Sequence, residues 1–528
     1  MRAHRSLRLR TRWVSTALAA AILTTGFSTP AFAPVAAAQV VLPSLGDSAS
    51  EEIPVGYERR IGDRIMRSIW RDPDYLDDPI LQDALQGMFH RLVEASRHRG
   101  NIPSELDERF AWQVFLVRDR TVNAFALPGG YIGVHLGLIA MTTSPDELAS
   151  VLAHELSHVT QRHIARSVGA SKTSSMIGLA TAILGILAAS RSPEAANALI
   201  AGGQAVSIQG QLNFSRDMER EADRVGFGVL TEAGYAPAGM AAMFEKLAQA
   251  SRLNDNNSFP YLRTHPLTTE RIGEARQRLG PGVAKEPPHP LVYATLQARA
   301  RVLMDPRVDA LRRQQDLGSD RAQTLAVTPL EKLAGAYSSV LASTLLREWA
   351  RADAVLPMAY AEADGNAQAK REVDLLAAQS YIARGDGARA GALLEPLLAS
   401  DEGQDSRAVK LMLAQRALVP GPANTAQLKV EADRLQTWVA VHQEDALAWQ
   451  TLSQLWGRLD QRLRAMRADA ESRAAEGDLQ GAVDRLRNAQ KLARAGNTDF
   501  IEASVVEARL RELETQRRRQ AEEDRREG

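Results

Sequence analysis

The sequence predicts a mainly α-helical protein of the α+β class: a helical domain with a small β-sheet, followed by an α-solenoid of tetratricopeptide-like repeats. Three observations carry this prediction. Apolar residues recur at helical spacing along most of the chain, while strand and turn signals gather between residues 112 and 134. Beyond a proline- and glycine-rich stretch at 280–290, the sequence becomes alanine-rich and helical in pattern.

Length and composition set the outer limits. The 528 residues suffice for two or three domains, and 45% apolar with 24% charged residues is ordinary globular usage. The formal net charge is zero, but the first 38 residues hold five arginines and no acid, so the remainder is mildly acidic. That balance, with 5% aromatic residues, indicates no nucleic-acid partner. The chain has no cysteine, so stability must come from packing or bound metal.

An export signal is predicted at residues 1–38. A basic segment leads into the apolar run "WVSTALAAAILTTGF" and then into small residues, and we expect cleavage after Ala38 in "VAAA|QV". A membrane anchor is the alternative, but the apolar run is short for a spanning helix. Cleavage would place the mature protein in the periplasm of a Gram-negative bacterium.

The first regular elements read as short strands. "WQVFLV" (residues 112–117) predicts one strand, and residues 123–134 predict two more around the turn signal "PGG" at 128–130. A strand at the edge of a sheet can bind an extended peptide by adding it to the sheet. The alternative is a hairpin that serves only for packing. The candidate substrate-binding residues are Asn123, Ala124, Phe125, Ala126, Gly129 and Gly130.

A helix is predicted to follow. In "TTSPDEL", Ser144 precedes Glu147 by three residues with proline between them, which is a capped helix start. His154 and His158 then lie about 40° apart around the helix axis, with Glu155 about 100° from His154. Two imidazoles so placed can share one cation while the glutamate faces a water on it, as in zincins. A solvated polar face is the alternative, but apolar residues flank the motif on both sides.

A catalytic zinc takes three protein ligands and keeps one open position. The stretch "NFSRDMEREADRVG" offers acids downstream. Glu219 and Asp223 are four residues apart and share a helix face, so one can bind metal while the other hydrogen-bonds a ligand histidine. Glu221 points away from that pair. An acid-rich helix that is merely soluble is the alternative.

These motifs together resemble the Ste24/HtpX/Oma1 family of gluzincin metalloproteases, and in particular its periplasmic branch with C-terminal tetratricopeptide repeats. The match extends to "NAFALPGGYIGVHLGLI" before the histidine helix and "HPLTTERI" after the acidic one. The resemblance implies a zincin-type fold, one Zn²⁺ per chain, and peptide-bond hydrolysis by metal-activated water. It supports Glu219 as the third ligand, with Glu221 as the second candidate, and Glu155 as general base.

Within "HPLTTERI", His265 precedes Pro266, so its backbone is biased to an extended conformation. This histidine is a candidate fourth ligand in a resting state, or a group that polarises the scissile carbonyl. Arg271 is a candidate to stabilise the oxyanion. A surface histidine is the alternative reading of His265. His163 lies opposite His154 on the helix, so we do not expect it to be a ligand.

The segment "MIGLATAILGILAA" (residues 176–189) is too short to span a bilayer. A buried core helix, a lid over the cleft, and a surface that dips into the membrane all remain open for it. The chain divides into a signal peptide at 1–38, a zinc metalloprotease domain at 39–280, a linker at 281–290, a repeat domain at 291–515 and a charged tail at 516–528.

The repeat prediction depends on recurring pairs. Gly385-Asp386 and Gly477-Asp478 each stand between helical patterns with small and apolar residues at tetratricopeptide spacing, and Trp449 opens another pair. Stacked pairs of this kind form a solenoid with a concave binding surface. A plain helical bundle is the alternative.

The resemblance implies a periplasmic zinc endopeptidase in quality control or assembly of outer-membrane proteins, which degrades misfolded substrates. Its expected partners are unfolded or misassembled outer-membrane proteins and, through the repeats, the barrel-assembly machinery, with a peripheral membrane contact. The alternative is a chaperone-like assembly factor that works mainly through its repeats. We also expect self-restraint, by His265 on the metal, by segment 170–210 over the cleft, or by the repeats.

Overall fold

The computed structural model describes residues 53–170, 215–253, 259–280, 289–420, 425–495 and 499–527. The predicted signal peptide, the apolar segment 176–189 and most of the predicted linker lie outside these residues. All described residues belong to one compact unit, Gly46–Gly528. None of the helices in the described part of the chain is long and apolar enough to cross a membrane.

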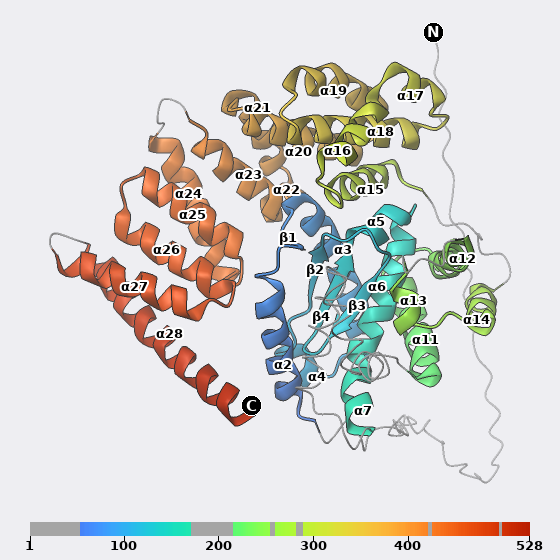
Figure 1. Cartoon of the computed structure of the whole chain (residues 1–528), viewed down its shortest axis with the longest axis horizontal. Helices are drawn as coiled ribbons and strands as arrows, with labels where there is room; N and C mark the ends of the chain where they lie inside the picture. Colours follow the sequence, from blue (N-terminus) through green and yellow to red (C-terminus); the bar gives the residue numbers. More distant parts are fainter. Residues whose placement is uncertain are drawn as a thin grey trace, which may run out of the picture. The chain divides into compact units, whose positions relative to one another are not determined.

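A four-stranded sheet forms the centre of the first domain (Figure 1). Its strand order is β1-β2-β4-β3; β2 and β4 are parallel, and the two outer pairs are antiparallel. The predicted strands are therefore confirmed, and β3 is an edge strand. The bounds are β1 (Tyr75–Leu76), β2 (Gln113–Val117), β3 (Ala124–Leu127) and β4 (Tyr131–His135).

The turn between β3 and β4 needs its two glycines. Gly129 and Gly130 have φ angles of +80° and +88°, in the left-handed region that glycine enters without steric cost. The "PGG" signal thus fixes the hairpin that places β3 at the sheet edge.

Helices cover both faces of the sheet. Because successive residues of a strand point to opposite faces, β2 contributes to two separate clusters. One cluster joins the sheet to α2 (Val55–Ile69) and includes Ile61, Ile65, Met66, Phe115, Val117, Leu127 and Tyr131. The larger core on the other face joins it to α3 (Pro79–His98) and α6 (Pro145–Thr160), with the strand residues Val114, Leu116, Ile132 and Val134.

Helix α6 begins where the sequence predicts. The Ser144 hydroxyl accepts a hydrogen bond from the Glu147 N–H (3.1 Å), with Pro145 in the first turn. The reciprocal half of a capping box is absent here, because the Glu147 carboxylate accepts from the Thr143 N–H (2.7 Å) instead. The helix ends at Thr160, and the chain turns before α7 (His163–Ala170).

The remaining helices of the domain surround α6, which packs against α3, β3, α11 and α12 (Figure 1). Gly226 of α11 allows a close approach, since a Cβ there would lie 3.1 Å from the Ala153 carbonyl oxygen of α6. These helices are α4 (Ser104–Arg109), α5 (Leu136–Met141), α11 (Arg216–Glu232), α12 (Ala238–Leu253), α13 (Tyr261–Thr264) and α14 (Thr269–Leu279).

The second half of the chain consists of helices that pack against their neighbours in sequence, so the prediction of helical repeats is confirmed. They are α15 (Leu291–Leu303), α16 (Val308–Gln315), η1 (Asp316–Gly318), α17 (Asp320–Leu325), α18 (Pro329–Leu345), α19 (Trp349–Ala363), α20 (Ala367–Ala383), α21 (Gly387–Ala399), α22 (Asp401–Asp405), α23 (Arg407–Leu418), α24 (Thr425–Val441), α25 (Ala446–Arg458), α26 (Arg462–Ala475), α27 (Leu479–Arg494) and α28 (Phe500–Glu527).

The two Gly-Asp pairs have the same structural role. Gly385 and Gly477 adopt φ angles of +87° and +77°, and each ends a helix. The aspartate that follows caps the next helix: Asp386 accepts from the Arg389 N–H, and Asp478 from the Gly481 N–H. Each pair therefore makes a tight turn between two helices, α20–α21 and α26–α27.

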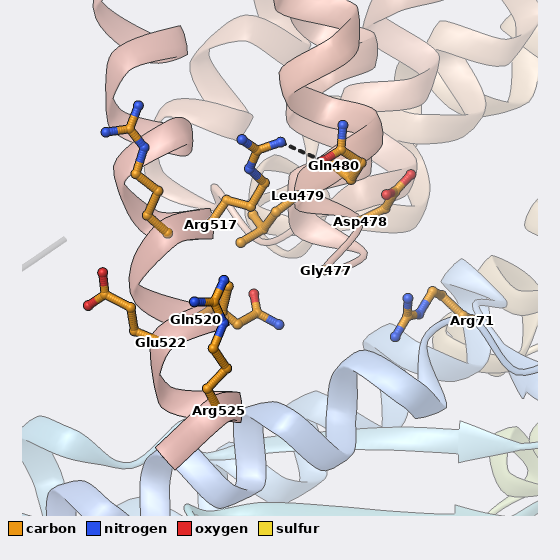
Figure 2. A pocket seen from close by; sticks show the side chains of 11 residues that line it. Arg71, Gly477, Asp478, Leu479, Gln480, Arg517, Gln520, Glu522 and Arg525 are labelled. Atoms are coloured by element: carbon orange, nitrogen blue, oxygen red, sulfur yellow. Dashed lines mark hydrogen bonds between the residues drawn. The ribbon is translucent and has the colours of Figure 1, made fainter. Parts of the chain in front are cut away.

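The last helix, α28, continues through most of the predicted charged tail. Figure 2 shows its C-terminal half beside the start of α27, where Arg517 donates to the Gln480 side-chain oxygen (2.5 Å). A cleft of about 600 Å³ lies at this place, with Arg71, Arg518 and Arg525 also in its lining.

Candidate metal centre

Four side chains from three segments meet in the interior of the first domain. His154 and His158 come from α6, Glu219 from α11, and His265 directly follows α13. None of the four is more than 2% exposed, and one ligand atom from each lies within 4.8 Å of the others. The structure thus brings together the two predicted histidine ligands, the predicted carboxylate ligand and the candidate fourth ligand.

The spacing of these atoms fits a tetrahedral metal ion. His154 Nε2 lies 3.0 Å from His158 Nε2 and 3.3 Å from His265 Nδ1. Glu219 Oε1 lies 3.0 Å from His265 Nδ1 and 3.4 Å from His158 Nε2. In a tetrahedral zinc site with bonds of 2.0–2.1 Å, ligand atoms are about 3.3 Å apart. Three imidazoles and one carboxylate are also donors that zinc prefers, so the residues fit the metal.

Glu155 lies against this cluster and is completely buried. Its Oε1 is 3.4 Å from His265 Nε2, and its Oε2 accepts a hydrogen bond from the Ala126 N–H of β3 (3.1 Å). Burial raises the pKa of this carboxyl, against the lowering effect of the neighbouring histidines. A carboxylate of this kind is a suitable proton acceptor.

Two charged side chains, Asp223 and Arg271, contact the cluster residues from outside the cluster. Asp223 Oδ1 lies 3.0 Å from His154 Nδ1, the ring nitrogen that faces away from the cluster. Arg271 donates to both Asp223 oxygens (2.7 and 2.8 Å), and its Nη1 is 2.7 Å from Glu219 Oε2. The Arg271 guanidinium therefore holds two carboxylates in this structure.

The electrostatics favour a cation. Burial lowers the pKa of both α6 histidines, but in His154 hydrogen bonds donated to Asp223 and Glu219 outweigh it and raise the pKa to about 10. In His158 burial prevails, and its pKa falls well below the ordinary value. Burial opposes the ionisation of Glu219, yet the His265 charge and hydrogen bonds from the histidines hold its pKa far below the usual range. Two of the three buried carboxylates, Glu219 and Asp223, thus pair with the permanent positive charge of Arg271.

Two residues near the centre have contacts that the sequence did not predict. His163 is fully buried, with Nδ1 2.9 Å from His158 Nδ1 and Nε2 3.0 Å from Glu221 Oε2. The expectation that His163 lies on the opposite helix face assumed a helix that continues past Thr160. Tyr261 stacks on His265 at 4.6 Å between ring centres. Its position four residues before the histidine in "YLRTH" is the signal that was available.

The candidate substrate-binding residues separate into two groups. Ala124, Phe125 and Ala126 lie on edge strand β3, and the Ala126 N–H points away from β4 toward Glu155. Gly129 and Gly130 lie at the far end of the hairpin, where their nearest neighbours are Arg59 of α2 and Phe110.

A helix with two histidines and a glutamate, a carboxylate from a second helix, and a sheet edge beside the glutamate define a metallopeptidase of the gluzincin kind. Residues 81–279 match the model of peptidase family M48, which supports a metalloprotease in this part of the chain.

Several relatives extend the comparison. The chain is 29% identical over 534 residues to the beta-barrel assembly-enhancing protease of Escherichia coli, which covers 96% of each protein. A relative from Vibrio cholerae is 38% identical over 239 residues, but the match spans only 47% of that protein and 45% of this chain. The mitochondrial metalloendopeptidase OMA1 of Saccharomyces cerevisiae is 28% identical over 223 residues, 41% of this chain and 61% of that protein.

Proposed function

We propose that this protein is a zinc-dependent endopeptidase of the periplasm that removes misfolded or misassembled outer-membrane proteins. The observation that carries the proposal is the convergence of four buried donor residues, with ligand atoms within 4.8 Å of one another, beside a buried glutamate. The name of the Escherichia coli relative, which matches along nearly the whole chain, supports the assignment to outer-membrane protein assembly. We further propose that the helical repeats bind these substrates or the assembly machinery.

His154, His158 and Glu219 would hold the zinc, which when bound supplies a polarised water and a Lewis acid for the scissile carbonyl. Glu155 takes a proton from the attacking water and passes it to the leaving amine. Asp223 accepts from His154 and fixes its tautomer. Arg271 neutralises the carboxylates on that side of the cluster.

The substrate would bind along β3. The Ala126 N–H points away from β4. Backbone N–H and C=O groups of successive strand residues point alternately to the two edges of the strand, so those of Ala124, two residues earlier, also point away from β4. An extended peptide added to this edge reaches Glu155 through backbone hydrogen bonds alone. Recognition of this kind accepts many sequences, as long as the substrate is unfolded.

The metal content of purified protein tests the proposal directly. Wild type should bind one equivalent of zinc, and His154→Ala should bind none, because it removes a ligand at the centre of the cluster. Absence of zinc from the wild type after incubation with the metal would refute the proposed function.

A chaperone-like role is the second candidate, and the length of the helical region, residues 291–527, favours it. The two functions separate in cells that lack the protein. Full-length Glu155→Gln should retain zinc and folding but fail to clear misfolded outer-membrane proteins. Complete rescue by this variant would show that binding alone accounts for the function.

A further inference from the structure

Behind the candidate zinc site, a row of polar contacts leads from His158 through His163 to the Glu221 carboxylate of α11. His158 directs Nε2 toward the cluster, where it lies 3.0 Å from His154 Nε2 and 3.4 Å from Glu219. Its other ring nitrogen, Nδ1, is 2.9 Å from His163 Nδ1. His163 Nε2 in turn is 3.0 Å from Glu221 Oε2. Both histidines are fully buried.

These distances determine where the protons are. A histidine that binds a metal through Nε2 must carry its proton on Nδ1. The His158 Nδ1–H then donates to His163, which must accept at Nδ1 and carry its own proton on Nε2. That proton is donated to Glu221. Each of the two short contacts holds one proton, so a single arrangement satisfies the whole row.

The Glu221 carboxylate, at the end of this row, has a second polar partner. Arg166 also forms an ion pair with Glu221 Oε2 (2.8 Å), so this carboxylate oxygen contacts both His163 and a guanidinium group. Glu221 does not enter the cluster of potential ligands, although its neighbour Glu219 does.

The backbone between the two histidines is shaped for the contact. Arg162 has a φ angle of +52°, which is uncommon for a residue with a side chain, and it breaks the helix after Thr160. The Arg162 side chain is held by Glu58 (3.3 Å) and by the Ile53 carbonyl. The turn brings His163 back beneath His158, whereas a continuous helix would carry it about 140° around the axis.

We propose that His163 is a positioning residue for the metal centre: with Glu221 it forms a carboxylate–imidazole relay that keeps the His158 proton on Nδ1 and leaves Nε2 free for the metal. The proposal rests on the proposed zinc site. Each α6 ligand is then oriented by an anion of α11. Asp223 acts directly on His154, and Glu221 acts on His158 through a second imidazole.

Zinc affinity of the full-length protein, measured by competition with a chromogenic chelator, tests the relay. His163→Phe keeps a buried ring but removes the acceptor, and we expect the affinity to fall about 10- to 100-fold, as it does when a ligand histidine loses its partner. His163→Gln returns an acceptor oxygen and should recover part of the loss. His135→Phe is the matched control, because His135 is also buried but contacts Asp119 and Thr121 away from the cluster. Its zinc affinity should stay within about twofold of wild type.

Thermal unfolding of the zinc-free variants separates stability from metal binding. Wild-type zinc affinity in His163→Phe, or an equal loss in His135→Phe, would overturn the relay while leaving the zinc site itself intact. Nitrogen-15 NMR of the zinc-loaded wild type gives an answer even where a variant does not fold. His158 should be protonated at Nδ1 and His163 at Nε2, and the opposite tautomer of His163 would overturn the proposal. No zinc in the wild type would instead refute the proposed function.

Discussion

Three carboxylates of α11 occur within five residues, yet each has a different set of contacts. Glu219 faces the histidine cluster, Asp223 pairs with His154 and Arg271, and Glu221 pairs with His163 and Arg166. Helical spacing explains the first two, since residues four apart share a face. The sequence pattern alone left open which of Glu219 and Asp223 binds the metal, and the family resemblance favoured Glu219 with Glu221 as the second candidate.

Zinc content should therefore differ among single variants of this helix. Glu219→Gln should lose zinc strongly because it removes a ligand. Asp223→Asn should weaken affinity about 10- to 100-fold, and Glu221→Gln should retain stoichiometric metal, since its amide oxygen still accepts from His163. Metal analysis after dialysis, with chelator competition, distinguishes these cases. Zinc loss confined to the Glu221 variant would reverse the assignment.

His265 is the residue through which we expect restraint of the protease. Its Nδ1 lies 3.0 Å from Glu219 and 3.3 Å from His154, which is the position of a fourth ligand. A site closed by four protein ligands has no place for water, the arrangement of structural rather than catalytic zinc. His265→Ala should therefore raise basal cleavage of an unfolded protein substrate at unchanged zinc content. A lower turnover in this variant, with only three protein ligands in the resting wild type, would make His265 purely catalytic.

At the scale of elements, the sequence predicted the strands, turns and helix starts that depend on neighbouring residues. The three strands, the "PGG" turn, the cap at Ser144 and the Gly-Asp turns of the repeats all depend on residues close together in the chain. The break at Arg162 was missed, because its φ of +52° is held by partners about a hundred residues away, Glu58 and Ile53. Similarly, the Arg271 contacts to Glu219 and Asp223 depend on how α14 packs against α11. The spacing of residues along the sequence does not predict this packing.

The packing of α11 on α6 tests how closely the centre depends on helix distance. Gly226→Val would place a branched side chain against the Ala153 and His154 backbone of α6. A Cβ at position 226 alone would lie 3.1–3.2 Å from these backbone atoms. We expect a stability loss of about 1–3 kcal/mol and weaker zinc binding, because Glu219 and Asp223 move with the helix. Gly273→Val is the control, since no atom lies within 4 Å of a Cβ there. Wild-type zinc affinity in Gly226→Val would show that the helix distance is not critical.

Helix α2 introduces a dependence of stability on pH through Glu58. Burial raises the pKa of this carboxyl from 4.5 to about 7, despite the nearby Arg162. The folded state binds the proton more tightly than the unfolded state, so the free energy of unfolding should fall as pH rises from 4.5 to 7, by up to about 3 kcal/mol. Glu58→Gln should flatten this decline in denaturant unfolding curves. Glu105→Gln, on the exposed side of α4, should leave it unchanged, and a parallel pH profile in Glu58→Gln would exclude the mechanism.

At the scale of the whole molecule, partly buried charges near the start of α3 join the sheet-containing part of the chain to the helices after residue 291. Arg407 of α23 binds Asp77 through two hydrogen bonds (2.6 and 2.7 Å) and Asp445 through two more (2.7 and 2.8 Å). Asp83 of α3 accepts from the Ala408 N–H (2.9 Å), so a carboxylate of the protease domain caps a helix of the repeats. No local sequence signal marks the contacts of Asp77 and Asp83, because their partners are more than 300 residues away in the sequence.

Removal of the Arg407 guanidinium should loosen this junction. Arg407→Met leaves the buried Asp445 and the partly buried Asp77 without their shared cation, which should cost about 1–3 kcal/mol, less than the loss of a fully buried partner. Hydrogen–deuterium exchange should therefore rise about 10-fold or more in both residues 77–84 and residues 406–412, because 1.4 kcal/mol corresponds to a factor of ten. Arg389→Met is the matched control. Arg389 pairs with Asp386 at the surface, away from Asp77 and Asp445, so exchange at the junction should not change. Asp77→Asn in the Arg407→Met background should restore part of the protection by removing one unpaired charge. Equal exchange at the junction in wild type and Arg407→Met would show that apolar packing around Ile80 holds the domains together without the charges.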